Sequence, residues 1–250
     1  MAHVRRDLVY AEHPGYRPLS LDLHLPDAPH PPVVLFLHGG GWRVGSRRTF
    51  VPGLAGPDGF GRITAEGWAV AAVDYRLSGE ARWPAQLADV TAAIEWVTSA
   101  TEVDGSRLVL WGESAGGHLA ALAGLRDPRV RGVIDWYGPA DLRTMPGADD
   151  PQTREAALLG MPAASDPDLA AHASPVASVI IGAPPFHIAH GDDDRSVPVA
   201  QSEELARALR RVGADVTLQI VPGADHLWRG LGDPATVFDP ALAFLGRIAG

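Results

Sequence analysis

The 250-residue chain contains no cysteine and no lysine. The absence of cysteine excludes disulfide bonds, a thiolate nucleophile and any metal site with sulfur ligands. Because lysine is missing, every strongly basic side chain is an arginine, and we interpret this bias as a sign of a GC-rich genome rather than of function. The net charge of −9 argues against nucleic acid or an anionic membrane as the main partner.

Long hydrophobic runs are also absent. The N-terminal stretch MAHVRRDLVYAEHPG lacks the apolar core of a signal peptide, and no later stretch has the length of a membrane span. We therefore expect a cytoplasmic protein with no membrane partner. No repeat or linker divides the chain, so we expect residues 1–250 to form a single domain.

Short apolar runs alternate with longer amphipathic stretches. The runs that are nearly all apolar predict strands buried on both faces of a sheet, at residues 33–38, 68–75, 107–112, 130–138, 186–191 and 215–223. Residues 19–25, LSLDLHL, alternate strictly between apolar and polar side chains. This alternation predicts an antiparallel strand near the sheet edge with one face in water.

Helical patterns lie between these runs. Apolar residues share one helical face after Pro84, between Pro198 and Gly213, and in residues 234–248. Alternating strands and helices predict an α/β fold with a mainly parallel sheet covered on both faces. The stretch 139–185 breaks this pattern, and we expect it to contain short helices and to act as a lid. A simple surface elaboration is the alternative.

Ser114 lies in the sequence GESAGG, between the predicted strand LVLW and a predicted helix that begins SAGGHLAALAGL. G-x-S-x-G in this context predicts a nucleophile elbow, in which a sharp turn exposes the serine hydroxyl at the end of a strand. The elbow requires a strained backbone, and small neighbours permit the bend. A flexible glycine-rich turn is the alternative.

The sequence HGGGW follows the predicted strand at 33–38. Consecutive glycines let backbone N–H groups approach a ligand closely, so this loop is a candidate oxyanion hole, together with the N–H of Ala115. A phosphate-binding loop is the rival interpretation, but the lysine and hydroxyl residue of that motif are missing. A plain turn is the other alternative.

A serine nucleophile needs a base, and the base needs a group that orients it. His226 lies in PGADHLW after the last predicted strand, and HGDDDRSVP places three aspartates after the preceding strand. The order serine, aspartate, histidine is the one expected of this kind of fold. We expect His118 to be a packed structural histidine, and His38 and His190 to hydrogen-bond loop backbone at strand ends.

These motifs together resemble the α/β-hydrolase fold. HGGGW, GESAGG, HGxxDxxVP and GxxH occur in the order found in serine esterases with an HGGG oxyanion loop, the feruloyl-esterase-like and hormone-sensitive-lipase-like carboxylesterases. VDYRLS and WPAQLADV, at 73–78 and 83–90, match the same group. The resemblance runs from about Leu19 to the C-terminus. It implies a sheet of about eight strands and chemistry that needs no metal or organic cofactor.

The resemblance also implies roles for individual residues. In HGxxDxxVP, the register makes Asp194 the acid and leaves Asp192 and Asp193 at unconstrained positions. The oxyanion donors correspond to Gly40, Gly41 and Ala115. One departure stands out, because too few residues precede the HGGG strand for the helical cap of the lipase-like members. The lid would then come mainly from 139–185, as in the compact feruloyl-esterase-like group.

We therefore expect a serine hydrolase that cleaves carboxylic esters of small or aromatic substrates through an acyl-enzyme. Amide hydrolysis of the formamidase type is an alternative, and a non-catalytic ligand receptor on the same fold is another. Trp42, Tyr137 and Trp228 flank expected site positions, and we expect their rings to bind the substrate. The alternative is that they only pack the lid against the sheet.

Overall fold

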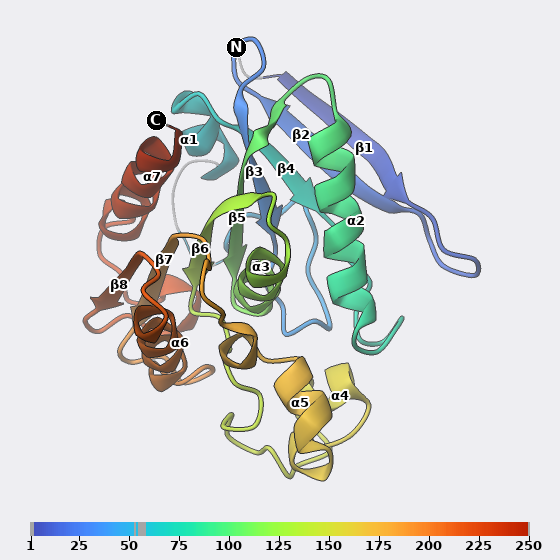
Figure 1. Cartoon of the computed structure of the whole chain (residues 1–250), viewed down its shortest axis with the longest axis vertical. Coiled ribbons are helices and arrows are strands. Elements are labelled where there is room, and N and C mark those ends of the chain that lie inside the picture. The colour runs from blue at the N-terminus through green and yellow to red at the C-terminus, as the bar shows by residue number, and fades with distance from the viewer. Residues whose placement is uncertain (1–2, 53, 55–58, 250) are drawn as a thin grey trace.

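The computed structural model describes residues 3–52, 54 and 59–249, which are built on an eight-stranded sheet (Figure 1). The strand order is β1-β2-β4-β3-β5-β6-β7-β8. β2 pairs antiparallel with β1 and β4, and all other pairs are parallel. The strands are β1 (His3–Ala11), β2 (Leu19–Leu25), β3 (Pro32–Leu37), β4 (Ala69–Val73), β5 (Asp104–Glu113), β6 (Val130–Trp136), β7 (Phe186–Gly191) and β8 (Val216–Val221). The predicted fold class is confirmed.

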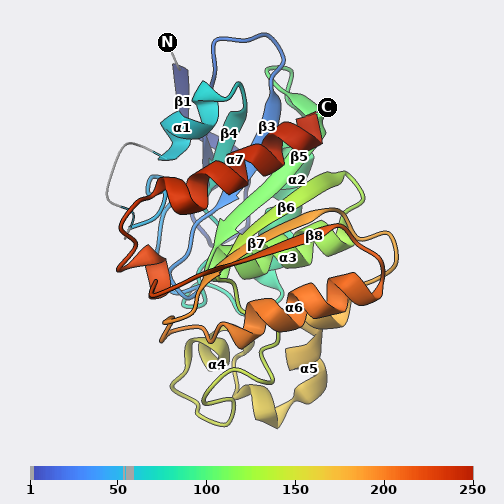
Figure 2. The same cartoon turned by 90° about the vertical axis from the view of Figure 1, so that its left-hand side faces the viewer.

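Helices cover both faces of the sheet (Figure 2). The α-helices are α1 (Gly59–Ala65), α2 (Ala85–Ser99), α3 (Ala115–Arg126), α4 (Arg154–Leu159), α5 (Pro167–His172), α6 (Ala200–Arg211) and α7 (Ala235–Ala249). Short 3₁₀ turns occur at Ala163–Ser165, Pro175–Ser178 and His226–Trp228. Within the described ranges, no helix combines the length and apolarity needed to cross a bilayer.

Strand β3 shows why the central strands are apolar throughout. Val33, Leu35 and Leu37 pack into the core under α2, α3 and α6. Val34 and Phe36 point to the other face, into the core under α1 and α7. Successive side chains of a strand alternate between faces, so a strand covered on both sides must be apolar at every position.

Strand β2 is antiparallel, as predicted, but its polar face is only partly in water, since Ser20 and His24 are half-buried and Asp22 is buried. Asp22 is 1% exposed, and its Oδ1 accepts a hydrogen bond from Arg47 Nε at 2.9 Å. Arg47 also pairs with Asp74. The expected wet face is therefore found only in part, because the loop that carries Arg47 covers Asp22 and supplies a partner for the buried carboxylate.

Residues 139–185 form the connection between β6 and β7, which contains α4 and α5 (yellow, below the sheet in Figure 1). The backbone N–H of Leu142 donates to Ser174 Oγ at 2.9 Å, and that of Val176 donates to the Ala140 carbonyl at 3.1 Å. The chain therefore leaves the sheet region and returns to it at one point. We call residues 142–174 the excursion.

Candidate active site

Ser114 joins the end of β5 to the start of α3. Its φ of 54° and ψ of −120° lie in a region that non-glycine residues rarely adopt. A Cβ atom on Gly112 would lie 2.0 Å from the Gly116 carbonyl oxygen, and one on Gly116 would lie 1.9 Å from that of Leu37. Larger residues would force the strand and the helix apart, so the flanking glycines permit the bend.

Ser114 is brought together with His226 and Asp194. Ser114 Oγ lies 2.9 Å from His226 Nε2, and His226 Nδ1 lies 2.7 Å from Asp194 Oδ2. An ionised carboxylate can only accept, so Nδ1 of the neutral ring carries the proton and Nε2 accepts from the serine hydroxyl. This tautomer prepares His226 to take the serine proton.

The Asp194 carboxylate, on the loop after β7, is held by several donors. Oδ1 accepts from the N–H groups of Ser196 and Val197, each at 2.8 Å. Oδ2 also lies 3.3 Å from His190 Nε2. Burial alone would raise the pKa of Asp194, but hydrogen bonds from His190, His226 and the Val197 N–H hold it well below its usual range. Asp194 therefore stays ionised at neutral pH.

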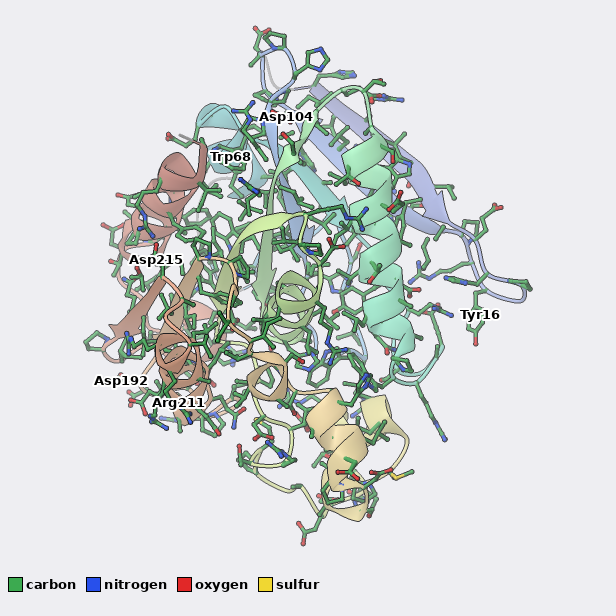
Figure 3. All side chains as sticks on the ribbon, in the orientation of Figure 1. Tyr16, Trp68, Asp104, Asp192, Arg211 and Asp215 are labelled. Carbon is green, nitrogen blue, oxygen red and sulfur yellow. The ribbon has the colours of Figure 1, made fainter. Side chains whose placement is uncertain are left out.

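The two preceding aspartates point elsewhere. Asp192 is exposed at the end of β7 (Figure 3), and its Oδ1 accepts from the Gly223 N–H at 2.7 Å. Asp193 is exposed too, and its own N–H donates to the Ala224 carbonyl at 3.2 Å. Within the described part of the chain, neither carboxylate has a hydrogen bond to His226.

Asp225 ties the acid loop to the base loop, a role that sequence reasoning missed. Its Oδ1 accepts from the N–H of His226 at 2.7 Å and from that of Arg195 at 3.0 Å. The N–H groups of Arg195 and His226 lower the pKa of Asp225. The only signal in the sequence is an aspartate directly before the histidine, which is also common in ordinary turns.

The glycine loop after β3 presents free backbone donors. The N–H of Gly39 donates to Glu113 Oε1 at 2.7 Å. The N–H groups of Gly40, Gly41 and Ala115 have no hydrogen-bond acceptor among the residues that the structure describes. They are free to bind an anion beside the serine, as expected of an oxyanion hole.

Glu113, the residue before the serine, is a second group that sequence reasoning missed. It is 2% exposed, and burial raises its pKa to about 7, although the Gly39 N–H and the nearby Tyr137 counteract this effect. A Cβ atom on Gly39 would lie 2.3 Å from Glu113 Oε1. The carboxyl group therefore fixes the start of the glycine loop and leaves no room for a side chain there.

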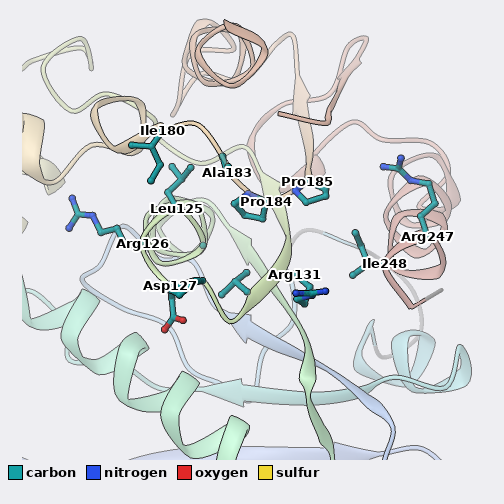
Figure 4. A pocket seen from close by; sticks show the side chains of 14 residues that line it. Leu125, Arg126, Asp127, Arg131, Ile180, Ala183, Pro184, Pro185, Arg247 and Ile248 are labelled. Carbon is teal, nitrogen blue, oxygen red and sulfur yellow. The ribbon is translucent and has the colours of Figure 1, made fainter. Parts of the chain in front are cut away.

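A cavity of about 430 Å³ lies in front of Ser114. The glycine loop, Ser114 and His226 line it, together with Arg154 of the excursion and Arg229. A larger depression of about 580 Å³ lies at the opposite, amino ends of the strands, between the end of α3 and that of α7 (Figure 4). It contains none of the expected site residues.

Trp42, Tyr137 and Trp228 do not line the cavity, which contradicts their expected role in substrate binding. All three are at most 2% exposed. Their φ angles are 56°, 46° and 60°, in the left-handed region that bulky residues rarely adopt, and all three rings lie in the interior. Trp42 packs edge-on against His118, and Tyr137 lies between His226 and Trp228.

The other histidines near the site are structural. His118 is fully buried, donates from Nε2 to the Ala173 carbonyl at 2.6 Å, and has its pKa lowered to about 4 by burial. His38 Nδ1 contacts the Gly39 carbonyl at 2.7 Å, and His190 Nε2 contacts that of Val197 at 2.9 Å. In the described residues, no group of three or more histidine, aspartate or glutamate side chains could hold a metal ion.

Comparison with known proteins points to esterases. A family model described as BD-FAE matches residues 21–209. Esterase LipC of Mycobacterium tuberculosis is 32% identical over 247 residues, which cover 89% of this chain and 59% of LipC. Esterase LipQ of the same organism is 32% identical, covering 85% of this chain and 55% of LipQ. The chain thus spans little more than half the length of these curated relatives.

Solved structures match over nearly the whole chain. A truncated carbohydrate esterase from gut microbiota superposes with a TM-score of 0.87 at 28% identity, covering 99% of this chain and 96% of that one. Esterase 2 of Thermogutta terrifontis with bound propionate gives a TM-score of 0.75 at 27% identity, covering 98% and 92%. The fold described above is therefore shared, over nearly its whole length, with structures of compact esterases.

Proposed function

The chain belongs to the BD-FAE family, and from this membership we propose that it is a carboxylic ester hydrolase that works through an acyl-enzyme on Ser114. One observation carries the proposal: the hydrogen-bonded series from Ser114 through His226 to Asp194, at 2.9 and 2.7 Å, borders a cavity of about 430 Å³. The esterase names of the relatives support the same reaction.

In the first half of the reaction, Ser114 Oγ attacks the ester carbonyl while His226 Nε2 takes the hydroxyl proton. Asp194 stabilises the imidazolium that forms. His226 then gives the proton to the leaving alcohol, which departs and leaves the acyl group on the serine. In the second half, His226 activates a water that attacks the acyl-enzyme, and the carboxylic acid is released with Ser114 regenerated.

The HGGG loop is proposed as the main part of the oxyanion hole. Its free donors are the N–H groups of Gly40 and Gly41, joined by that of Ala115 at the positive end of α3. Each donor of this kind typically contributes about 10²–10³ in rate, because it stabilises the charge that develops on the carbonyl oxygen. Glu113 keeps the Gly39 N–H out of this set.

We propose small esters as substrates. The cavity volume of about 430 Å³ is near the lower end of the range for small-molecule pockets, roughly 300–1,000 Å³. Esterase 2 of Thermogutta terrifontis, whose structure matches this chain, was solved with propionate bound, which is a short-chain carboxylate. The sequence predicted esters of small or aromatic substrates. Because the three aromatic rings are buried, they supply no wall for an aromatic acyl group, and we retain only the small substrates.

Hydrolysis of p-nitrophenyl acetate tests the proposal. Ser114→Ala should lower turnover by about 10⁶, the usual cost of removing a triad nucleophile. Ser165→Ala, at an exposed serine of the excursion, is the matched control and should behave as wild type. Circular dichroism should show that both variants fold. If folded Ser114→Ala retained near wild-type turnover, the proposed mechanism would be refuted.

A further inference from the structure

We propose that the cavity in front of Ser114 binds an anionic group of the substrate, so that the preferred ester also carries a carboxylate or a group of similar charge. This inference rests on the proposed esterase function. Two arginines from separate segments, Arg154 and Arg229, line the same cavity as the serine. In the residues that the structure describes, neither guanidinium has a hydrogen bond or an ion pair with the protein.

Arg154 is placed directly beside the glycine loop. A Cβ atom on Gly41 would lie only 2.4 Å from Arg154 Cδ, so the aliphatic stem of the arginine rests on the backbone of Gly41. The guanidinium group begins at the next atom of the side chain. Its positive charge therefore lies at the cavity wall next to the oxyanion donors, on a half-buried side chain whose stem packs against Gly41.

Arg229 borders the cavity from the loop that carries the base. Its carbonyl accepts a hydrogen bond from the Asp225 N–H at 2.8 Å, which fixes the backbone position. The residue is exposed, so its charge is screened by solvent more than that of the half-buried Arg154. We assign the main contact with the anion to Arg154 and a weaker, salt-sensitive contribution to Arg229.

No carboxylate of the described cavity wall neutralises these cations. Glu113 is the one acidic side chain of that wall, and its Oε1 accepts the Gly39 N–H at the floor. Elsewhere in the protein, arginines with nearby carboxylates pair with them, as Arg143 does with Asp141 at 2.6 Å. The chain as a whole has a net charge of −9, so the positive charge of the cavity is a local property. It favours the binding of an anionic ligand there.

The cavity wall also offers neutral donors. Ser46, Thr49 and Ser196 line it with hydroxyl groups, alongside a few apolar side chains. A guanidinium group matches the planar geometry of a carboxylate and can form two parallel hydrogen bonds with it. A hydrogen bond to a charged group contributes enough binding free energy for about a 10- to 100-fold effect on affinity.

The test compares esters that differ only in charge. For an anion on the acyl side, monoethyl glutarate is compared with its neutral amide analogue, ethyl 4-carbamoylbutanoate. For an anion on the alcohol side, 4-acetoxybutanoate is compared with 4-acetoxybutanamide. In at least one pair, wild type should favour the anion by kcat/KM, and Arg154→Gln should lower that preference about 10- to 100-fold. The responding pair identifies the side that carries the charge.

Arg131→Gln is the matched control. Arg131 is exposed, has no ion pair in the described structure and lines the depression at the opposite end of the strands. This variant changes the net charge by the same amount and should leave the preference at its wild-type value. The inference would be overturned if, for both pairs, the ratio of kcat/KM for the anionic ester to that for the neutral ester were the same in Arg154→Gln as in wild type. Such a result would leave the proposed ester hydrolysis intact.

Binding to the inactive protein separates the two proposals. Isothermal titration of monoethyl glutarate and 4-acetoxybutanoate into Ser114→Ala and into Ser114→Ala/Arg154→Gln measures the anion contact without turnover. Arg154-dependent binding supports the anion site even if wild type hydrolyses no ester, a result that would refute only the proposed function. Binding that does not depend on Arg154 would overturn the anion site.

Discussion

Glutamine in place of Glu113 should stabilise the protein relative to wild type as the pH rises from about 5 to 8. The buried carboxyl has its pKa raised to about 7 from an ordinary 4.5, chiefly by desolvation. Between these two values the unfolded chain has lost the proton while the folded protein keeps it. The folded state therefore binds more protons, and wild-type stability contributed by this group falls as the pH rises.

The size of the effect follows from the distance between the two pKa values. At about 1.4 kcal/mol per pH unit, the loss approaches about 3 kcal/mol once the pH exceeds about 7, and it is absent below about pH 4.5. Glu113→Gln keeps the oxygen that accepts the Gly39 N–H but cannot ionise. Any cost of the new amide group is constant with pH, so the pH-dependent part of the difference isolates the carboxyl group.

The measurement is urea unfolding followed by tryptophan fluorescence, at several pH values from about 5 to 8. The free energy of unfolding of Glu113→Gln minus that of wild type should rise by about 2 to 3 kcal/mol across this range. Glu66→Gln, at an exposed glutamate after α1, is the control and should give a nearly flat difference. A flat or falling difference for Glu113→Gln would show that burial of this carboxyl does not govern its ionisation.

Three further predictions concern the acid, the buried ion pair and the glycine loop. Asp194→Asn should lower kcat for p-nitrophenyl acetate by about 10⁴ by favouring the wrong histidine tautomer, whereas Asp193→Asn should change it little; the reverse order would reassign the acid. Arg47→Met should lower the free energy of unfolding by about 2 to 3 kcal/mol in urea, because buried Asp22 loses its closest cation and keeps only the Asp7 N–H and the more exposed Arg6 and Arg48, and a loss below about 1 kcal/mol would contradict this. Gly41→Ala should reduce kcat/KM for the same ester about 10²-fold, since φ is +60°, which strains an alanine, and the added methyl group would displace the Arg154 side chain; wild-type kinetics would contradict the oxyanion role of the Gly41 N–H.

The central strands could be predicted from sequence because burial on both faces leaves a continuous apolar run. Strand β1 could not, because it lies at the sheet edge, is largely exposed, and has register irregularities between Arg5 and Leu8 and between Val9 and Ala11. Helix α1 is short and begins with glycine, so it lacks a helical apolar period. The elements that were missed are those whose positions depend on neighbours rather than on their own pattern.

The site residues also fall into two groups, those that a sequence motif predicts and those that only tertiary packing brings to the site. Ser114 and His226 stand out because each lies in a motif with its own local geometry, and the register of a family motif selects Asp194. Glu113 was visible beside the serine, but its bond to Gly39 arises only because β3 and β5 are parallel neighbours. The cavity position of Arg154 comes from tertiary packing alone.

The three aromatic residues show the opposite error. Trp42, Tyr137 and Trp228 are close to site residues along the chain, and closeness in sequence suggested closeness to the substrate. In the folded protein all three rings are buried in the interior and do not line the cavity. The direction of each ring depends on the tertiary packing around it, which a single sequence does not reveal.

The two ends of the excursion lie next to each other, so this segment could be exchanged for the corresponding segment of a relative. Leu142 and Ser174 are joined by a hydrogen bond, so the two ends of the excursion meet at one point. Between them, Leu158 and Ala170 are part of the main hydrophobic core, so a replacement segment would have to fill the same space. The serine, the acid and the base come from strand ends outside the excursion, whereas Arg154 comes from within it. Exchange of the excursion between relatives would replace the wall of the cavity that carries Arg154. The serine, the acid and the base of the recipient would stay in place.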